Sequence, residues 1–290
     1  MYHRVALLGC PGSSKSTCGL SYPGVEQHVF GSSEEDTALN FSKRSDILPC
    51  YKPDWFDCLS EADKEKFRSD KTTEEEIAFL TKVARAKNIT KYRRYLYSLK
   101  HDLSQGKRPE LKTVFLDNGT PFSQEFQDYV EVVYGKEFET EKGNFNSIKF
   151  SIKYQTELTD FLRLFYSIPC HTIMSFHISM TLDEETASKA NFMEATKKGI
   201  KYPKEWQPMI YGKARYVVAG IPTWAFYLWT EENPGLPNKY FAKLEADSVN
   251  VGVAKSRIQP FDKPNKIELP NGTFFDFLNG AIEKKIKKEK

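Results

Sequence analysis

The sequence predicts an α/β fold in which a mostly parallel sheet is flanked by helices. Three observations support this fold class. The apolar run 4–8 leads through a loop of small residues into a short helical segment. Two more apolar runs, 111–116 and 170–177, each follow a helical segment and end in polar residues. Strands that alternate with helices in this order are typical of parallel sheets.

The loop after the first apolar run has the pattern of a phosphate-binding site. It consists of Gly9, Cys10, Pro11, Gly12, Ser13, Ser14, Lys15, Ser16 and Thr17. Small residues let consecutive backbone N–H groups turn toward an anion, and the N-terminus of the following helix adds partial positive charge. In such a loop Lys15 would contact the β- and γ-phosphates of a nucleotide, and the Ser16 hydroxyl would bind Mg²⁺.

Ser14 departs from the usual pattern, which has glycine directly before the lysine. A Cβ at this position is compatible with the loop only if the backbone conformation suits a residue other than glycine. We therefore expect Ser14 to affect the rate of hydrolysis more than nucleotide binding. An ordinary turn rich in Gly and Ser, between a strand and a helix, is the alternative interpretation.

Asp117 follows the apolar run 111–116 and is a candidate for the second Mg²⁺ contact. Its carboxylate would hold a metal-bound water while Ser16 binds the ion itself. Taken alone, a strand that ends in Asp-Asn-Gly is more often a turn. The phosphate-loop pattern upstream makes the metal role the preferred interpretation.

Candidates for water activation follow two other predicted strands. Glu34 and Glu35 come after the strand 26–30, at the end where α/β sheets bind their ligands, and either could act as the general base. A solvated acidic loop is the alternative. His177 ends the run 170–177 and could sense the γ-phosphate or polarise the water. A hydrogen-bonded histidine at a strand end is an equally good interpretation.

A long helical region is predicted after residue 72. Thr73 and Glu76 match a capping box, and the apolar spacing that follows predicts one helix, or two that are broken near Asn88. The preceding segment 41–71 is expected to be irregular. For the basic residues among the tyrosines of this helix, a solvated face is preferred over nucleic-acid contact. These basic residues are Lys91, Arg93, Arg94 and Lys100.

The C-terminal third is predicted to contain an aromatic β-hairpin formed by 223–229 and 239–245. A short Phe-rich helix and a basic tail follow. We therefore divide the chain into a core, 1–260, and a C-terminal extension, 261–290. In the tail 283–290 five lysines stand against two glutamates, an excess equal to the net charge of +3 of the whole chain.

Length and composition are those of a globular protein with a sizeable core: 290 residues, 40% of them hydrophobic and 28% charged. The net charge of +3 is too small to indicate nucleic-acid binding by itself. Five cysteines without paired metal-ligand spacing indicate reduced thiols. No apolar run approaches a membrane span, and a strand begins almost at once, so we expect a cytoplasmic protein with no membrane partner.

The order of these features resembles that of the phage-encoded RecA-like P-loop ATPases, the group that includes single-strand annealing and recombination proteins. The similarity extends over residues 4–258, and its specific residues are Lys15, Ser16 and Asp117. The resemblance implies a RecA-like sheet, binding of Mg-ATP, self-association as a ring or filament, and action on single-stranded DNA.

Lys255 and Arg257 are two residues apart, so on an extended strand their side chains leave the same face. Two such cations are unfavourable to bury unpaired, so they should meet carboxylates or an anion. In a RecA-like assembly this face would abut the nucleotide of the neighbouring subunit. Arg257 would then act as an arginine finger, with Lys255 beside it. An intramolecular ion pair or a solvated turn is the alternative.

The preferred function is an oligomeric ATPase that acts on single-stranded DNA in phage recombination, annealing or replication. DNA contacts are expected from the segment 181–208 and the lysine tail, with Phe192, Tyr202 or Trp206 stacking on bases. A nucleotide-binding scaffold that has lost hydrolysis is the second hypothesis, because a loop glycine is replaced. A small-molecule P-loop kinase is the third, with the long basic helix as its lid.

Overall fold

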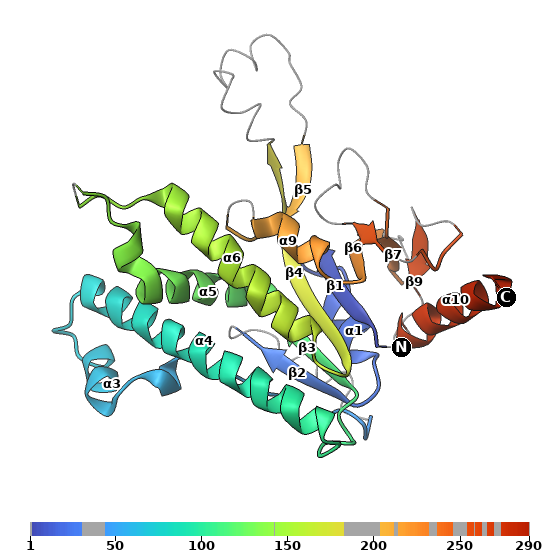
Figure 1. Cartoon of the computed structure of the whole chain (residues 1–290), viewed down its shortest axis with the longest axis horizontal. Coiled ribbons are helices and arrows are strands. Elements are labelled where there is room, and N and C mark those ends of the chain that lie inside the picture. Colours follow the sequence, from blue (N-terminus) through green and yellow to red (C-terminus); the bar gives the residue numbers. More distant parts are fainter. Residues whose placement is uncertain are drawn as a thin grey trace, which may run out of the picture.

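The structure, a computed structural model, describes residues 2–30, 44–141, 143–182, 204–211, 214–231, 237–245, 254–257, 259–262, 266–269 and 274–289. Its strands are β1 (Arg4–Gly9), β2 (Val25–Val29), β3 (Thr113–Asp117), β4 (His171–Leu182), β5 (Lys204–Pro208), β6 (Trp224–Glu231), β7 (Lys239–Lys243), β8 (Lys255–Ser256) and β9 (Ile267–Leu269). They form one sheet with the order β2-β3-β4-β1-β6-β7-β9, while β5 pairs with β4 and β8 with β6 (Figure 1).

The central part of the sheet is parallel. β1 pairs with β4 and β6, and β3 pairs with β2 and β4, all in parallel. β7 and β9 extend the sheet in antiparallel pairing. Gly9 lies level with His177, and Val29 lies level with Asp117. β1 and β3 therefore end at one edge, where open α/β sheets bind ligands. The prediction that His177 ends its strand is wrong, because β4 continues past this edge to Leu182 and pairs there with β5.

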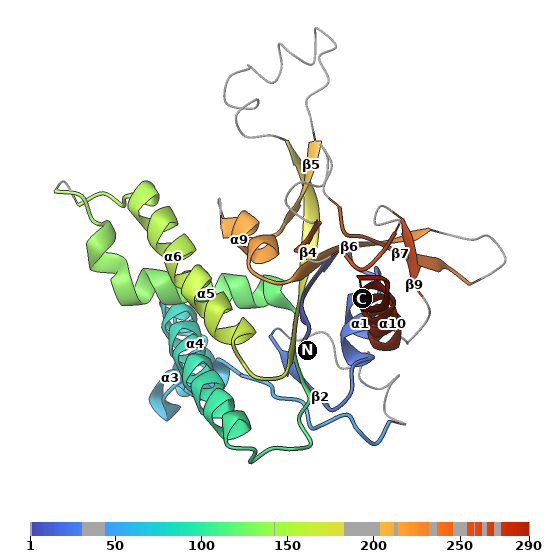
Figure 2. The ribbon, with the colours of Figure 1, turned by 45° about the vertical axis from the view of Figure 1, so that its right-hand side comes forward.

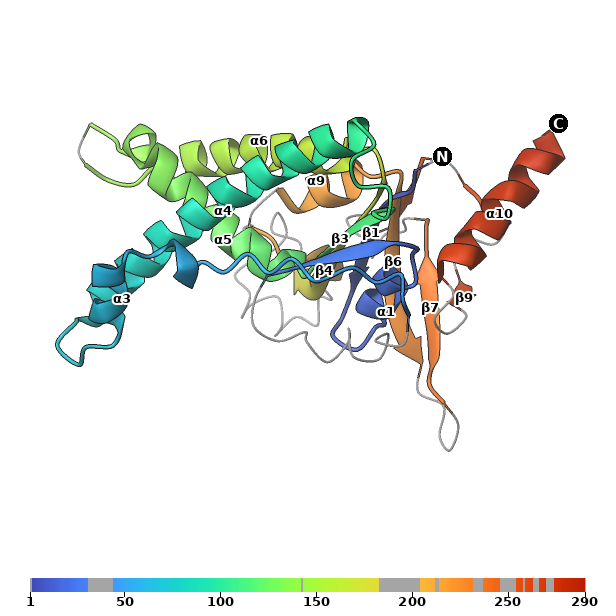
Figure 3. The same ribbon diagram turned by 90° about the horizontal axis from the view of Figure 1, so that it is seen from below.

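Helices cover both faces of this sheet, which confirms the predicted α/β class. On one face lie α4 (Glu74–Ser104), α5 (Gly119–Tyr134), α6 (Ser147–Tyr166) and α9 (Arg215–Gly220), and on the other lie α1 (Lys15–Leu20) and α10 (Phe274–Glu289) (Figure 1, Figure 3). The side chains of β1 alternate between the two cores. Ala6 and Leu8 pack on the α4 side, and Val5 and Leu7 pack on the α1 side. A strand buried on both faces gives a continuous apolar run in the sequence.

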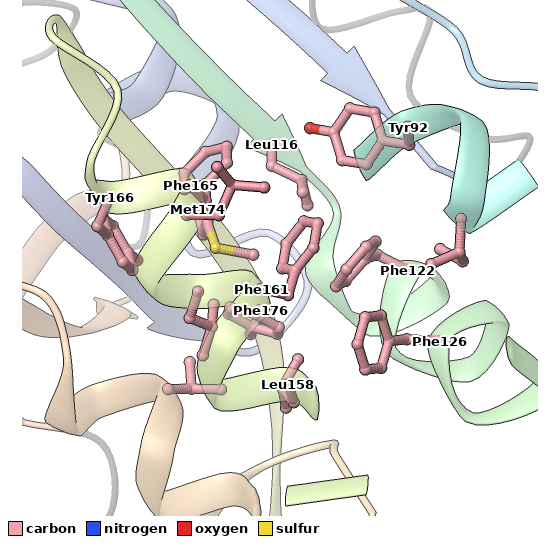
Figure 4. Packing of buried hydrophobic residues seen from close by; sticks show 14 of the residues in the cluster. Tyr92, Leu116, Phe122, Phe126, Leu158, Phe161, Phe165, Tyr166, Met174 and Phe176 are labelled. Atoms are coloured by element: carbon pink, nitrogen blue, oxygen red, sulfur yellow. The ribbon is translucent and has the colours of Figure 1, made fainter. Parts of the chain in front are cut away.

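The core on the α4 side is rich in aromatic rings (Figure 4). The rings of Phe122 in α5 and Phe161 in α6 have their centroids 4.6 Å apart. Side chains from β3 and β4 pack with them, among which are Leu116, Met174 and Phe176. Full burial of one such side chain stabilises the fold by about 1.5–3 kcal/mol. This packing fixes α5, which starts directly after β3.

α4 begins at the predicted capping box and is one unbroken helix. The Thr73 hydroxyl accepts from Glu76 N, and the Glu76 carboxylate accepts from Thr73 N. The sequence allowed a break in this helix near Asn88. Asn88 is buried, and its side-chain amide donates to Pro53 O at 3.2 Å and to Glu125 Oε2 at 2.9 Å. Because tertiary contacts satisfy this polar side chain, the helix continues through it.

The prediction of an irregular segment over 41–71 is wrong for residues 61–67. There α3 (Glu61–Phe67) forms, and the Ser60 hydroxyl caps it by accepting from Asp63 N. A short 3-10 helix, η1 (Phe56–Cys58), precedes it. A helix this short is marginal alone. Here it is held by a small core formed by Trp55, Phe56, Cys58, Leu59, Phe67, Leu80 and Ala84.

The predicted aromatic hairpin is confirmed, because β6 and β7 pair in antiparallel register. The end of the long polar segment forms β5 against β4, whereas 183–203, with the proposed stacking residues Phe192 and Tyr202, lies outside the described residues. Residues 261–290 supply β9 to the sheet, and the buried Phe274 and Leu278 of α10 to the core. In the described ranges no helix has both the length and the apolar character needed to span a membrane.

Glu125 on α5 is buried, and burial raises the pKa of its carboxyl from 4.5 to about 7, against the opposing effects of Asn88 and Arg85. A carboxyl whose pKa is raised by folding contributes its full stability at a pH below its pKa in the unfolded chain. This contribution is lost as the pH rises through about 7, the pKa in the folded chain. We therefore expect Glu125→Gln to raise the free energy of unfolding by about 2–3 kcal/mol at about pH 8 and by much less at about pH 5. Urea denaturation at the two pH values measures this.

The exposed Glu137, changed to Gln, is the matched control and should leave the pH dependence as it is. A Glu125→Gln protein whose stability varies with pH as much as that of the parent chain would contradict the assignment.

Candidate functional site

The loop between β1 and α1 is compact and depends on small residues. At Gly9 an added Cβ would lie 2.3 Å from Ser13 Oγ and 2.6 Å from a carbonyl oxygen of β6, so only glycine fits. Gly12 has a φ of 77°. Ser14 has a φ of 63° and a ψ of 22°, in the left-handed region. Thr230, near the end of β6, donates to Gly12 O at 3.1 Å and anchors the loop to the sheet.

Ser14 thus has the backbone conformation that glycine would adopt. The left-handed region is unfavourable by about 1–2 kcal/mol for a residue with a Cβ. An unstrained Cβ at Ser14 requires a backbone conformation that suits residues other than glycine. The left-handed conformation does not meet this requirement. The loop keeps its glycine-type geometry and contains local strain.

Lys15 is the first residue of α1, and its side chain folds back into the loop. Only 6% of its surface is exposed. Its Nζ donates to Gly9 O at 3.0 Å and to Cys10 O at 2.8 Å, and it lies 3.4 Å from Ser13 Oγ. The ammonium group is therefore enclosed by the loop, within reach of an anion that the loop would bind.

Asp117 ends β3 and is buried, with 1% of its surface exposed. Its side chain lies on the α1 side of the sheet, because Phe115, two residues earlier, packs in the core of that side. Gln27 Nε2 of β2 donates to Asp117 Oδ2 at 3.1 Å, and Ser175 Oγ of β4 donates to Oδ1. These neighbours orient the carboxylate, which has further lone pairs on both oxygens.

His177 of β4 lies next to the loop, level with Gly9. Its Nδ1 is buried and has no hydrogen-bond partner within the described part of the chain. Burial lowers the pKa of the imidazole below its usual 6.5, and the Lys15 ammonium lowers it further, while Asp117 and the Gly9 backbone act in the opposite direction. The ring is therefore neutral at neutral pH and can donate to a ligand or accept from it.

α5 also begins at this edge of the sheet. The Asn118 side chain caps it by accepting from Thr120 N at 2.7 Å. Thr120 Oγ1 in turn accepts from His177 N at 3.0 Å. At Gly119 an added Cβ would lie 2.3 Å from the ring of Phe176. These contacts tie the end of β3 to β4 and place the positive end of the α5 dipole here.

Four of the residues selected from the sequence lie at this one edge. Lys15 and Asp117 are close enough for the charge of each to act on His177. Ser16 follows Lys15 in the first turn of α1 and is half-buried. The edge therefore combines a cation, a carboxylate, a hydroxyl and a neutral imidazole.

The remaining loop residues from Gly9 to Thr17 lie at the same edge, whereas the other candidates lie elsewhere or outside the described residues. Glu34 and Glu35 are outside the described residues, and of Lys255 only the backbone is described, so their roles stay predictions. Arg257 follows β8, which pairs with the start of β6, while the loop is level with the middle of that strand. Arg257 N donates to Thr223 O, five residues before Leu228, which is level with Gly9. This offset is about 16 Å along the sheet. Arg257 is exposed, and its guanidinium donates to Gly220 O at 2.8 Å.

Four polar residues of the site were not selected from the sequence: Gln27, Thr120, Ser175 and Thr230. Gln27 lies inside the predicted strand 26–30, and Ser175 lies inside the apolar run 170–177. Their position in a predicted strand is the signal that could have pointed to them. A polar side chain in a buried strand needs a partner. Which partner it has depends on the order of the strands, which the sequence pattern did not determine.

Comparison with known proteins finds no matching family model and no similar curated protein. The functional assignment therefore rests on the residues of this chain and their geometry.

Because Ser14 has a positive φ, we expect Ser14→Gly to raise the free energy of unfolding by about 1 kcal/mol, through relief of backbone strain. Urea denaturation measures this. Ser14→Ala is the matched control, because it removes the hydroxyl but keeps the Cβ. An equal gain in both variants would show that the hydroxyl, and not the backbone conformation, is responsible.

Proposed function

We propose that this chain binds Mg-ATP at the loop 9–17 and hydrolyses it, as an oligomeric phage protein that acts on single-stranded DNA in recombination, annealing or replication. The observation that carries the proposal is the enclosed Lys15 ammonium, at the same sheet edge as Asp117 and His177. A lysine of an ordinary surface turn would extend into water, where its charge is best hydrated.

The contacts of Lys15 support a phosphate-binding role. Its Nζ donates to neutral carbonyl oxygens of the loop. Hydrogen bonds between an ammonium and a phosphate are charge-assisted and roughly twice as strong as those between neutral groups. Lys15 would therefore exchange these carbonyls for the β- and γ-phosphates, and the freed loop would turn its backbone N–H groups to the same anion.

The residues at the edge also fit Mg²⁺, which prefers oxygen ligands and needs only one or two side chains when a nucleotide supplies the others. Ser16 supplies a hydroxyl, and Asp117 a carboxylate that Gln27 and Ser175 hold in place. When bound, Mg²⁺ would neutralise charge on the β- and γ-phosphates. Asp117 would orient a water of the ion, and Ser16 would contact the ion itself.

His177 is the best-placed described residue for contact with the γ-phosphate or the attacking water. It is adjacent to Lys15, neutral, and its Nδ1 has no partner in the described ranges. A buried ring nitrogen without a hydrogen bond is unfavourable, and a ligand would satisfy it. Glu34 and Glu35 remain the proposed general bases.

Arg257 is proposed to act on a neighbouring subunit. Its position at the far end of the sheet leaves the loop of its own chain out of reach. Among the described residues its guanidinium donates to the backbone carbonyl of Gly220, a contact that a phosphate would replace. Lys255 would accompany it.

The first test is Lys15→Ala, which should abolish binding of Mg-ATP and its turnover, because the phosphates lose their closest cation. Asp117→Asn should reduce Mg²⁺-dependent turnover more than nucleotide affinity. Binding is measured by calorimetry, and turnover by phosphate release with and without single-stranded DNA. We expect the DNA to stimulate turnover in the parent chain.

Lys91→Ala, at an exposed position of α4, is the control for loss of one positive charge. Unchanged affinity and turnover in Lys15→Ala would refute the phosphate loop. Binding without turnover would favour the scaffold, and transfer of phosphate to a metabolite would favour the kinase.

The second test concerns Arg257. Arg257→Ala subunits should bind nucleotide but hydrolyse it about 10³–10⁵ times more slowly, the usual effect of losing an arginine finger. When mixed with Lys15→Ala subunits they should regain turnover, because each subunit supplies what the other lacks. Mixed assemblies that demonstrably form and stay as inactive as their components would exclude a role across the interface.

A further inference from the structure

A groove separate from the phosphate loop lies along α10. This C-terminal helix lies on the α1 side of the sheet (Figure 2). It has a volume of about 630 Å³, within the usual range for ligand sites. One wall is the segment 260–262. The other is a single face of α10, on which Phe277, Gly280, Ala281, Lys284 and Lys287 follow at helical spacing.

One end of the groove is aromatic. The rings of Phe261 and Phe277 are stacked, with centroids 5.3 Å apart and an angle of 24° between the planes. Both rings are half-buried, so they also present surface to the groove. Next to them Gly280 leaves open space, since a Cβ added there would meet nothing within 4 Å. This end can accept a flat apolar group against a ring.

The other end of the groove is basic. Lys284 and Lys287 lie one helical turn apart and are exposed, and Lys285 also lines the groove. Asp262 and Asp276 also line the groove, and on α10 Asp276 lies at the aromatic end. The difference between the aromatic end and the basic end would orient an anionic ligand. Its charged group would lie at the lysines, and its neutral part would lie at the rings.

We propose that this groove binds single-stranded nucleic acid, with phosphates at Lys284 and Lys287 and a base stacked at Phe261 and Phe277. This rests on the proposed action on single-stranded DNA and names the surface that performs it. Aromatic surface beside a line of cations is how proteins bind single strands without sequence preference. From Phe277 to Lys287 the helix extends about 15 Å, enough for more than one nucleotide. A duplex fits less well, because its base faces are covered by stacking.

The groove is connected to the phosphate loop through α1. Phe275 N, at the start of α10, donates to Ser21 Oγ at 3.1 Å, and Ser21 caps the end of α1. The other end of α1 is Lys15. A strand bound in the groove would therefore lie on α10, the helix that packs against the one with the nucleotide-binding residues.

The test measures fluorescence anisotropy of a labelled oligodeoxythymidylate with the full chain over a series of salt concentrations. The double variant Lys284→Glu and Lys287→Glu should bind at least tenfold more weakly, and the slope of log K against log salt should fall by about two. Gly280→Leu, which fills the groove without a change in charge, should weaken binding about tenfold, the effect of losing one stacked base.

Two controls match these variants. Lys91→Glu with Arg94→Glu reverses two exposed charges on α4 and should change affinity by less than the groove variant. Gly280→Ala adds only a Cβ and should bind as the parent chain does. An oligouridylate probe, run in parallel, distinguishes RNA from DNA as the preferred strand.

Affinity that is unchanged by both groove variants would overturn the inference, as would a parent chain that binds no oligonucleotide. In that second case DNA-independent ATP turnover would show that the nucleotide site itself stands. Groove-dependent DNA binding in a chain that neither binds nor hydrolyses ATP would support the groove and refute the proposed ATPase. An acidic peptide is tested in the same way. If the groove variants lose binding of this peptide but bind the oligonucleotide as the parent chain does, the inference is also overturned.

Discussion

The burial of β1 on both faces and along both edges is the constraint on which the rest of the structure depends. Its residues from Val5 to Leu8 are fully buried, and β4 and β6 flank it in parallel. Two cores of different composition lie on the two faces of the sheet, and β1 contributes side chains to both. All three strands run the same way, but β1 ends at Gly9 while β4 and β6 continue beyond it. The loop after Gly9 therefore leaves the sheet between two longer strands.

The loop itself is shaped by close approach. Gly9 leaves no room for a Cβ, and Ser14 occupies a conformation that its Cβ disfavours. Contacts from outside the backbone hold this shape: Thr230 from β6, and the Lys15 ammonium, which binds two carbonyls of the loop. Strain that is stabilised by the surroundings is common where a backbone must approach a ligand closely.

The polar residues of β2 show how one strand serves both faces. Gln27 faces the α1 side and orients Asp117. Glu26 faces the other side, where it accepts from Arg108 at 2.6 Å and contacts His28 at 2.9 Å. Although burial opposes it, hydrogen bonds from His28 and Arg108 hold the pKa of Glu26 at about 2. The pair with Arg108 therefore stays charged and ties β2 to the segment between α4 and β3. A run of polar residues in a buried strand is thus explained by two separate sets of partners.

The sequence by itself determined the features that depend on a few neighbouring residues. The strand, loop and helix around Lys15, the capping box at Thr73 and the hairpin of β6 and β7 are all encoded by short-range hydrogen bonds and by apolar spacing. So is the position of Asp117 at a strand end. These signals remain readable because local geometry and side-chain periodicity act within one or two turns of chain.

The tertiary structure alone decided what depends on the order and register of the strands. It brought Gln27 and Ser175 to Asp117, satisfied Asn88 inside an unbroken helix, stabilised the short α3, and put Arg257 at the far end of the sheet. Each of these contacts joins residues far apart in the chain or depends on a packed core. The free energy that stabilises these contacts comes from burial and hydrogen bonding across the whole domain. A local sequence pattern therefore does not predict them.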